Sequence, residues 1–348
     1  MLMVVTIGSS VRLDNVLDTA LKGAVHSMLS PREAMGADLK DRRVLFALSV
    51  DAHGIDATLT EFLRYLNKNE RSLEGSVGAL ITDGQSDLYT KELSRVLIFS
   101  ANRAGCTFLG KALTEATGSL QNFETLAKRA KTDVMTAYKN AARELVLRLK
   151  DFWPPKKERP RILTLHSSLR ETSNTLALGH ALEERLAAFC DIDEISLGEG
   201  RIRDCRGCSY TMCAHFAQAD SCFYGATIFE DIFPAVLACD ALLLLCPNYN
   251  DALGANITAF INRLTALLTK NTLYDKAVYA AVVSGYSGGD IVARQVLGSF
   301  CLNKTFYLPP RFALLETAND PGTAMRRDGI ERTLDNFANG MLMQLKKE

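Results

Sequence analysis

Apolar runs with little polar interruption alternate along the chain with stretches of helical periodicity. VLFALSV at 44–50, ALLLLCP at 241–247 and VYAAVVSG at 278–285 are apolar almost throughout. A strand with two apolar faces is typical of a parallel sheet that helices cover on both sides. At 126–149 and 330–345, apolar residues recur at steps of three and four, and we expect amphipathic helices there. The pattern predicts an α/β fold of three layers with parallel sheets.

The same plan occurs twice in the chain. Each copy has a strand, a polar loop and a helix, then further buried strands, and ends in an amphipathic helix. Internal similarity of this kind predicts two units of one fold. Offsets of 158, 198 and about 201 residues bring three pairs of segments into register: TIGSSVR (6–12) with TLHSSLR (164–170), ATLTEFLRYL (57–66) with ANITAFINRL (255–264), and VGALITDGQSD (77–87) with VYAAVVSGYSG (278–288).

A proline-rich segment, DFWPPKKERPR at 151–161, separates the two copies. Three prolines and a charge run fit neither a helix interior nor a central strand. We therefore expect a first domain at 1–150, a linker at 151–160 and a second domain at 161–348. The second copy has about 40 extra residues after its first helix, and DIDEISL within them alternates like a strand. We expect the second copy to have one strand more, which makes the N-terminal unit the shorter one.

Composition narrows the classes of partner. The 348 residues are 47% apolar, and 40 basic residues balance 40 acidic ones, so we expect no nucleic-acid partner and no anionic membrane partner. Apolar segments stay shorter than a bilayer span, and the opening MLMVVTIGSS is typical of a buried strand rather than a signal peptide. Nine cysteines, four of them clustered, suit a reducing compartment. We expect a cytoplasmic protein.

The loop SSLRETSNT joins the first strand of the second copy to a helix. Unpaired N–H groups and the helix dipole at such a junction favour a phosphate. Hydroxyl, amide and guanidinium donors would add to that site: Ser168, Arg170, Ser173, Asn174 and Thr175. The alternative is a set of helix-capping residues with no ligand, since Ser, Thr and Asn are favoured at that position in any case.

Two more loops follow buried strands of this copy. CPNYN places Pro247 and Tyr249 at a strand end, which offers a rigid edge and an aromatic face. SGYSGGD at 284–290 is rich in glycine, so a flat ligand could approach its backbone closely. Loops at the carboxyl ends of parallel strands meet at one edge of the sheet, where such folds bind ligands.

With these three loops, the second copy resembles the flavodoxin-like NADPH-dependent FMN reductase family, and especially its iron–sulfur flavoprotein branch. The resemblance covers residues 161 to about 310. It rests on S-x-R-x-x-S-N-T at 168–175, CRGC at 205–208, P-x-Y at 247–249 followed by AFINR, and SGYSGG at 284–289.

The resemblance implies roles for residues of each loop. The first loop, with the five residues named above, would hold the FMN phosphate. The isoalloxazine ring would be bordered by Pro247, Asn248, Tyr249 and Asn250, with Ser284, Gly285, Tyr286 and Gly288 near its pyrimidine side. We see no evident general base and name no catalytic side chain, which agrees with chemistry carried by a cofactor.

The resemblance also implies an activity: an FMN-dependent NAD(P)H oxidoreductase that reduces a small-molecule acceptor, such as a quinone or a flavin, by hydride transfer. Two alternatives stay open. One is an iron–sulfur flavoprotein that transfers electrons to a protein partner, and the other is a non-catalytic flavodoxin-like binding scaffold.

The first copy has lost most of this pattern. It retains Ser10, Arg12 and Asn15, but has SVD in place of P-N-Y and DGQSD in place of SGYSG. We therefore expect a degenerate, flavin-free unit. Because members of the family commonly dimerise, the eroded copy could serve as a built-in partner in a pseudo-dimer, or the chain could form a homodimer.

Four cysteines are spaced C-x2-C-x4-C-x8-C: Cys205, Cys208, Cys213 and Cys222. Thiolates at this spacing could ligate a [4Fe–4S] cluster or zinc, or could be a remnant without metal. Thr211 stands where the resembled branch has its third cysteine. We expect the other five cysteines to be buried in the core: Cys106, Cys190, Cys239, Cys246 and Cys301.

Overall fold

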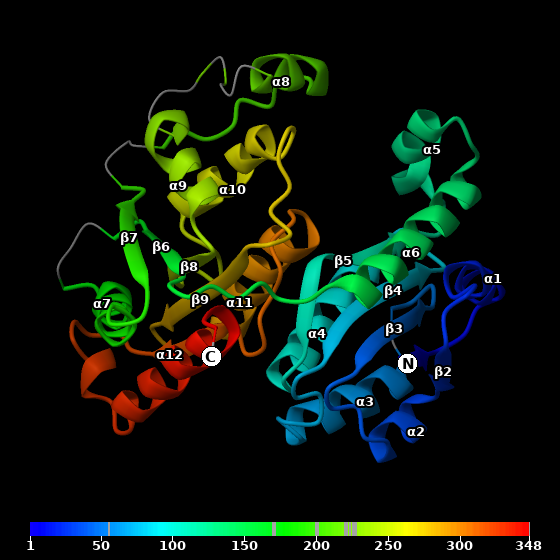
Figure 1. Ribbon diagram of the computed structural model, residues 1–348, viewed down its shortest axis with the longest axis horizontal. Helices are drawn as coiled ribbons and strands as arrows, with labels where there is room; N and C mark the ends of the chain where they lie inside the picture. The colour runs from blue at the N-terminus through cyan, green and yellow to red at the C-terminus, as the bar shows by residue number, and fades with distance from the viewer. Residues whose placement is uncertain are drawn as a thin grey trace. The chain divides into compact units, whose positions relative to one another are not determined.

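The computed structural model describes residues 1–54, 56–168, 172–198, 202–218, 222, 224 and 228–347. The chain divides into two compact units. The first unit comprises Met1–Trp153 and Leu308–Arg311, and the second comprises Pro154–Tyr307 and Phe312–Glu348. Both are α/β units with a parallel sheet between helices, which confirms the predicted fold class (Figure 1).

The first unit has five parallel strands in the order β2-β1-β3-β4-β5. Its strands are β1 (Leu2–Ile7), β2 (His26–Leu29), β3 (Arg43–Val50), β4 (Val77–Gly84) and β5 (Thr107–Ala116). Its helices are α1 (Val11–Ala20), α2 (Pro31–Gly36), α3 (Ala57–Lys68), α4 (Thr90–Arg103), α5 (Glu124–Ala130) and α6 (Val134–Asp151).

The second unit repeats that topology, with strand order β10-β9-β8-β6-β7. Its strands are β6 (Arg161–His166), β7 (Asp191–Ser196), β8 (Ala241–Pro247), β9 (Ala277–Ser284) and β10 (Ala313–Thr317). Its α-helices are α7 (Asn174–Leu186), α8 (Tyr210–Ala217), α9 (Phe233–Ala238), α10 (Ala255–Leu267), α11 (Gly289–Val296) and α12 (Ile330–Leu345). Helices α7 and α12 pack together on one face of the sheet, while α9 and α10 lie on the other (Figure 1).

The expectation of one extra strand in the second copy is wrong. The segment predicted at 191–197 does form β7, but the first unit has its counterpart in β2, so each described sheet has five strands. Strand β2 is only four residues long, lies at the sheet edge and alternates exposed with half-buried positions. Such a strand lacks the continuous apolar run by which a buried strand is recognised.

The single helix expected at 126–149 is two helices. Helix α5 ends before Lys131, which has a left-handed backbone conformation with φ of 53°. Helix α6 then begins after Asp133, whose carboxylate accepts a hydrogen bond from the backbone N–H of Thr136. The apolar periodicity continues across this break and therefore conceals it, because periodicity records the buried face and not the caps.

The cores of both units consist of apolar strand residues together with aromatic side chains from strands, helices and loops. In the first unit, Phe46 of β3 lies between Phe62 and Phe108, with both ring-centre distances 6.3 Å. In the second, Phe300 contacts Phe260 and Phe306. Every residue of β4 and β9 is buried, as expected for central strands that helices cover on both sides.

Helix α7 lies close against the sheet because of one glycine. A Cβ atom at Gly179 would lie 2.4 Å from Cδ1 of Leu245 in β8, so a larger side chain would push the helix away from the strand. The N-terminus of α7 is thereby held at the end of β6, beside the loops that follow the strands.

Within the described part of the chain, no helix combines the length and apolar character needed to cross a membrane.

Candidate functional site

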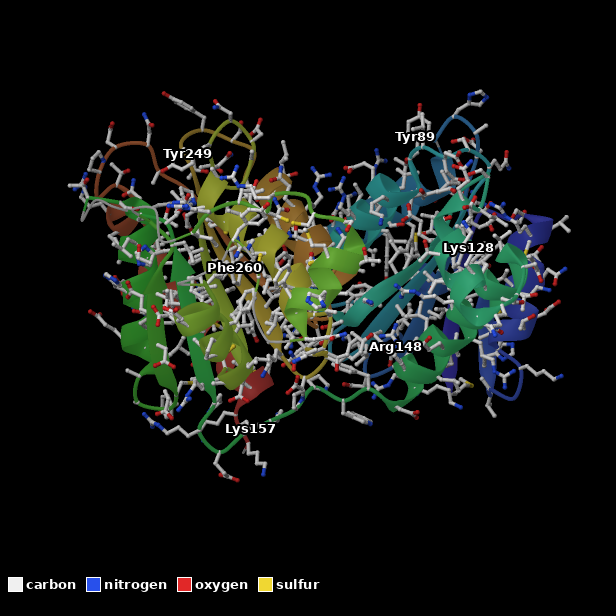
Figure 2. All side chains as sticks on the ribbon, turned by 90° about the horizontal axis from the view of Figure 1, so that it is seen from above. Tyr89, Lys128, Arg148, Lys157, Tyr249 and Phe260 are labelled. Carbon is white, nitrogen blue, oxygen red and sulfur yellow. The ribbon has the colours of Figure 1, made fainter. Side chains whose placement is uncertain are left out.

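The loops at the carboxyl ends of β6, β8, β9 and β10 surround one cavity of about 860 Å³. The strand order reverses between β6 and β8, and in open parallel sheets ligands bind at that reversal. Tyr249, after β8, marks this end of the second unit, and Lys157, just before β6, marks the opposite end (Figure 2). The lining residues are Ser167, Ser168, Thr172, Ser173, Asn174, Thr175, Pro247, Asn248, Tyr249, Asn250, Asp251, Val283, Gly285, Tyr286, Ser287, Ala318, Asn319 and Pro321.

The first loop brings hydroxyl groups to the N-terminus of α7. The hydroxyl of Ser173 accepts a hydrogen bond from the backbone N–H of Leu176 and so caps the helix. The hydroxyls of Ser168 and Ser173 lie 3.1 Å apart. The backbone N–H of Ser168 donates to Nδ1 of His166, at 3.2 Å. The capping role predicted as an alternative is therefore present at Ser173, beside a cavity that could hold a ligand.

Asn174 ties the first loop to the loop after β10. Its Nδ2 donates to the carbonyl of Asp320 at 2.8 Å, and its Oδ1 accepts from the backbone N–H of Ala324 at 3.2 Å. Both ends of this amide are therefore engaged within the protein. Its neighbour Thr175 is also buried, in the first turn of α7. Arg170, which the sequence predicts as a phosphate ligand, lies outside the described residues.

The second loop is organised by Asn248. Its Nδ2 donates to the hydroxyl of Ser284 at 3.1 Å and to the carbonyl of Ser287 at 2.9 Å, which joins the second loop to the third. Its Oδ1 is buried and has no hydrogen-bond partner in the protein. A buried acceptor without a partner is costly, so it points to a ligand donor. Tyr249 is 61% exposed, with its aromatic ring available at the cavity mouth.

The third loop needs its glycine at position 288. Gly288 has φ of 82°, and a Cβ atom there would lie 1.9 Å from Oδ1 of Asp251 in the second loop. Gly285 and Tyr286 line the cavity, whereas Ser284 and Gly288 lie behind the lining and hold it in place. Tyr286 is 83% exposed, and its hydroxyl accepts a hydrogen bond from Nδ2 of Asn319 at 3.4 Å.

Sequence reasoning missed the fourth loop. Ala318, Asn319 and Pro321 follow β10 and line the same cavity. The signal was present as TANDPG at 317–322, a run of turn residues directly after the apolar FALLE. A fourth strand end beside β9 implies a fourth loop at the same edge of the sheet.

The lining is polar but carries little charge. Among its described residues, the titratable groups are Asp251 and the two tyrosines, Tyr249 and Tyr286. Neither a histidine nor a lysine belongs to this described set. The arrangement can therefore bind and orient a ligand through hydroxyls, amides and backbone groups, and it suits a reaction whose chemistry a bound cofactor supplies.

At the corresponding edge of the first unit, one arginine links the ends of two neighbouring strands. The guanidinium of Arg12, in the first turn of α1, pairs with the buried carboxylate of Asp83 at 2.8 Å. It also donates to the carbonyl of Gly84, the last residue of β4, and to those of Thr117 and Gly118 after β5. This one cation thus links α1 to the ends of β4 and β5, the counterparts of β9 and β10 in the second unit.

The four clustered cysteines line one small cavity of about 50 Å³ in the second unit. Cys205 is exposed, and Cys208, Cys213 and Cys222 are half-buried. Burial raises the pKa of the Cys213 thiol, and the three neighbouring thiols raise it further. Among the described residues, no three of these sulfur atoms lie within 4.8 Å of one another. Zn–S bonds of about 2.3 Å would bring the four sulfurs closer together than that, so the arrangement is not a preformed zinc site.

Comparison with known proteins gives one family for the second unit. Residues 160–320 match the model of the family described as NADPH-dependent FMN reductase. Among solved structures, the chain is similar to an NAD(P)H:quinone oxidoreductase from Methanothermobacter marburgensis, at 12% identity and a TM-score of 0.41, over 55% of this chain and 100% of that one. It is also similar to the apo form of the NADH:FMN oxidoreductase EMOB, at 16% identity and a TM-score of 0.37, over 54% and 91%. No curated protein matches the chain.

Proposed function

We propose that the protein is an FMN-dependent NAD(P)H oxidoreductase acting on a small acceptor such as a quinone or a flavin, because residues 160–320 match the NADPH-dependent FMN reductase family. One observation carries this proposal. Three loops, each predicted separately from the sequence to hold part of FMN, meet around one cavity of about 860 Å³ at the point where the strand order reverses.

The first loop fits the phosphate end of FMN. Backbone N–H groups at the start of α7 are unpaired within a helix, and the helix dipole favours an anion there. The hydroxyls of Ser168, Thr172 and Thr175 lie around the same part of the cavity. Since the amide of Asn174 is engaged at both ends, it supports this loop by holding the loop after β10 against it.

The second and third loops fit the ring end. Tyr249 and Tyr286 offer exposed aromatic faces, and Gly285 lets a flat ring approach the backbone. The unpartnered Oδ1 of Asn248 would accept a hydrogen bond from a ring N–H. Bound FMN would supply hydride-transfer chemistry between NAD(P)H and the acceptor, and these loops would hold the ring and exclude water from one side of it.

The exposed ring of Tyr249 gives a test that does not depend on folding. Tyr249→Ala should weaken FMN binding about two- to tenfold, the value of one aromatic contact, as measured by quenching of flavin fluorescence with the full-length chain. The matched control is Tyr89→Ala, which removes a half-exposed tyrosine from a loop of the first unit and should leave the affinity unchanged. Equal effects of the two variants, or no FMN binding by the parent chain, would count against the proposal.

A second candidate is favoured by the convergence of Cys205, Cys208, Cys213 and Cys222 on one cavity. A cluster holds its ligand sulfurs further apart than a single zinc ion does, which agrees with thiols that do not form a tight group. In this candidate the cysteines would hold an iron–sulfur cluster, which would supply one-electron transfer between the flavin and a protein partner.

Iron and acid-labile sulfide, measured after anaerobic purification, distinguish the two candidates. Stoichiometric iron and sulfide that disappear in Cys205→Ser, with Cys239→Ser as the buried-cysteine control, would support the cluster. Parent protein that binds FMN and lacks iron and sulfide after anaerobic reconstitution would leave the first candidate alone.

A further inference from the structure

A second group of ligating side chains lies on β7 and α7, apart from the cavity lining. His180 and Glu183 stand on α7 at a spacing of three residues, which places them on the same face of the helix. Glu194 of β7 faces them. One ligand atom from each of these three side chains lies within 4.8 Å of the others, and Nε2 of His180 is 3.2 Å from Oε2 of Glu194.

The separation of these atoms suits a metal ion. Zinc binds imidazole nitrogen and carboxylate oxygen at about 2.0–2.2 Å, so tetrahedral ligand atoms lie about 3.3 Å apart. Imidazole nitrogen and carboxylate oxygen are both zinc ligands, and three protein ligands would leave a fourth position for water, as in open zinc sites. His180 is half-exposed, which leaves a path for an ion and a side for that water.

Two further observations separate this group from an ordinary surface ion pair. Oε1 of Glu183 is buried and makes no hydrogen bond of full geometry, and the neighbouring hydroxyl of Thr164 is likewise unpartnered, although a carboxylate oxygen normally has at least one partner. The second observation is that a hydrogen bond positions Glu194, because its Oε1 lies 2.9 Å from Nε2 of the buried His166. A ligand carboxylate fixed by a second hydrogen bond is typical of metal sites.

The hydrogen bonds of His166 fix its role. Its Nδ1 accepts from the backbone N–H of Ser168, so Nε2 carries the proton that it donates to Glu194. His166 is therefore a positioning residue for Glu194 and not itself a ligand. It also connects Glu194 to Ser168, which belongs to the loop that we propose to hold the FMN phosphate.

We propose that His180, Glu183 and Glu194 form a site for a divalent transition-metal ion of the zinc type, separate from the clustered cysteines. The ion bridges α7 to the edge strand β7 and leaves an open position for water. Because it binds the folded chain, it also raises the melting temperature. The site is a property of this chain's own residues and stands whether or not the FMN proposal holds.

Isothermal titration with zinc chloride alone tests the site. The protein is the full-length chain, stripped with chelator, with the four clustered cysteines changed to serine so that thiols cannot bind the ion. We expect one Zn²⁺ per chain in this parent. His180→Gln and Glu183→Gln should each weaken binding at least about tenfold, because each removes one ligand. Glu184→Gln, which changes the next, exposed carboxylate of α7, is the matched control and should bind like the parent.

Thermal unfolding gives a second readout that registers any misfolded variant. Zinc should raise the melting temperature of the parent and of Glu184→Gln, and at the same zinc concentration should raise that of His180→Gln less, while all three melt alike after chelation. Equal zinc affinity in His180→Gln, Glu183→Gln and Glu184→Gln would overturn the assignment, as would the absence of zinc binding by the parent.

Discussion

The nine cysteines fall into two chemical groups at the scale of single residues. Five are buried within the two units: Cys106, Cys190, Cys239, Cys246 and Cys301. Burial raises the pKa of Cys239 and of Cys246 to about 12, and that of Cys190 to about 11. A thiol becomes nucleophilic only when it loses its proton and can be reached, so these buried groups are unreactive near neutral pH.

This contrast predicts a two-phase labelling experiment. In metal-free protein at pH 8, iodoacetamide should modify Cys205, Cys208 and Cys222 quickly, because they are exposed or half-buried, and should modify the five buried thiols only after denaturation. Peptide mass spectrometry of samples taken over time reports each site. Native labelling of Cys239 or Cys246 at the rate of Cys205 would show that the core is not packed as described.

Arg12 shows that two aligned residues of the two units can have different surroundings in the structure. The alignment of TIGSSVR with TLHSSLR equates Arg12 with Arg170, which predicts similar places in the two units. In the structure, α1 already begins at Val11, whereas α7 begins at Asn174, so Arg12 stands inside a helix and pairs with Asp83. The loop between β1 and α1 is shorter than the loop between β6 and α7. Arg12 therefore forms an ion pair within its own unit, although its place in the sequence resembles that of a phosphate ligand.

At the scale of elements, glycine at the start of α11 decides how the second and third loops meet. Gly288→Ala should destabilise the protein by about 1–2 kcal/mol for the left-handed backbone, and should also weaken FMN binding, because the new Cβ displaces Asp251 and Asn248. Gly329→Ala is the matched control, since Gly329 has φ of 79° with no neighbour near its Cβ position.

Chemical denaturation and flavin titration of both variants separate the two effects. Both should lose stability, and only Gly288→Ala should lose FMN affinity. An unchanged affinity in Gly288→Ala would mean that the contact between the loops does not shape the site.

The sequence predicts the buried central strands well. It predicts the edge strand β2 and the loop after β10 poorly. Strands β3, β4, β8 and β9 are long apolar runs, and each was expected where it lies. Strand β2 was missed because at the sheet edge its side chains alternate between exposed and half-buried positions. The loop after β10 was missed because turn residues indicate a turn without indicating what the turn faces. The group of His180, Glu183 and Glu194 could not be expected either, because β7 contacts α7 only in the folded unit.

At the scale of the whole molecule, two copies of one topology differ at the edge where ligands bind. The second unit has a cavity there, and in the first unit Arg12 and Asp83 occupy the equivalent edge. The two units thus share one strand topology and differ in the loops at this edge. We propose that FMN binds only to the second unit, one molecule per chain.

Anaerobic titration of the FMN-loaded full-length chain with NADPH tests the central claim most directly. The account predicts that one bound flavin per chain loses its visible absorbance on addition of about one equivalent of NADPH, and that a quinone restores the absorbance. Bound flavin that keeps its absorbance in excess NADPH and in excess NADH would contradict it.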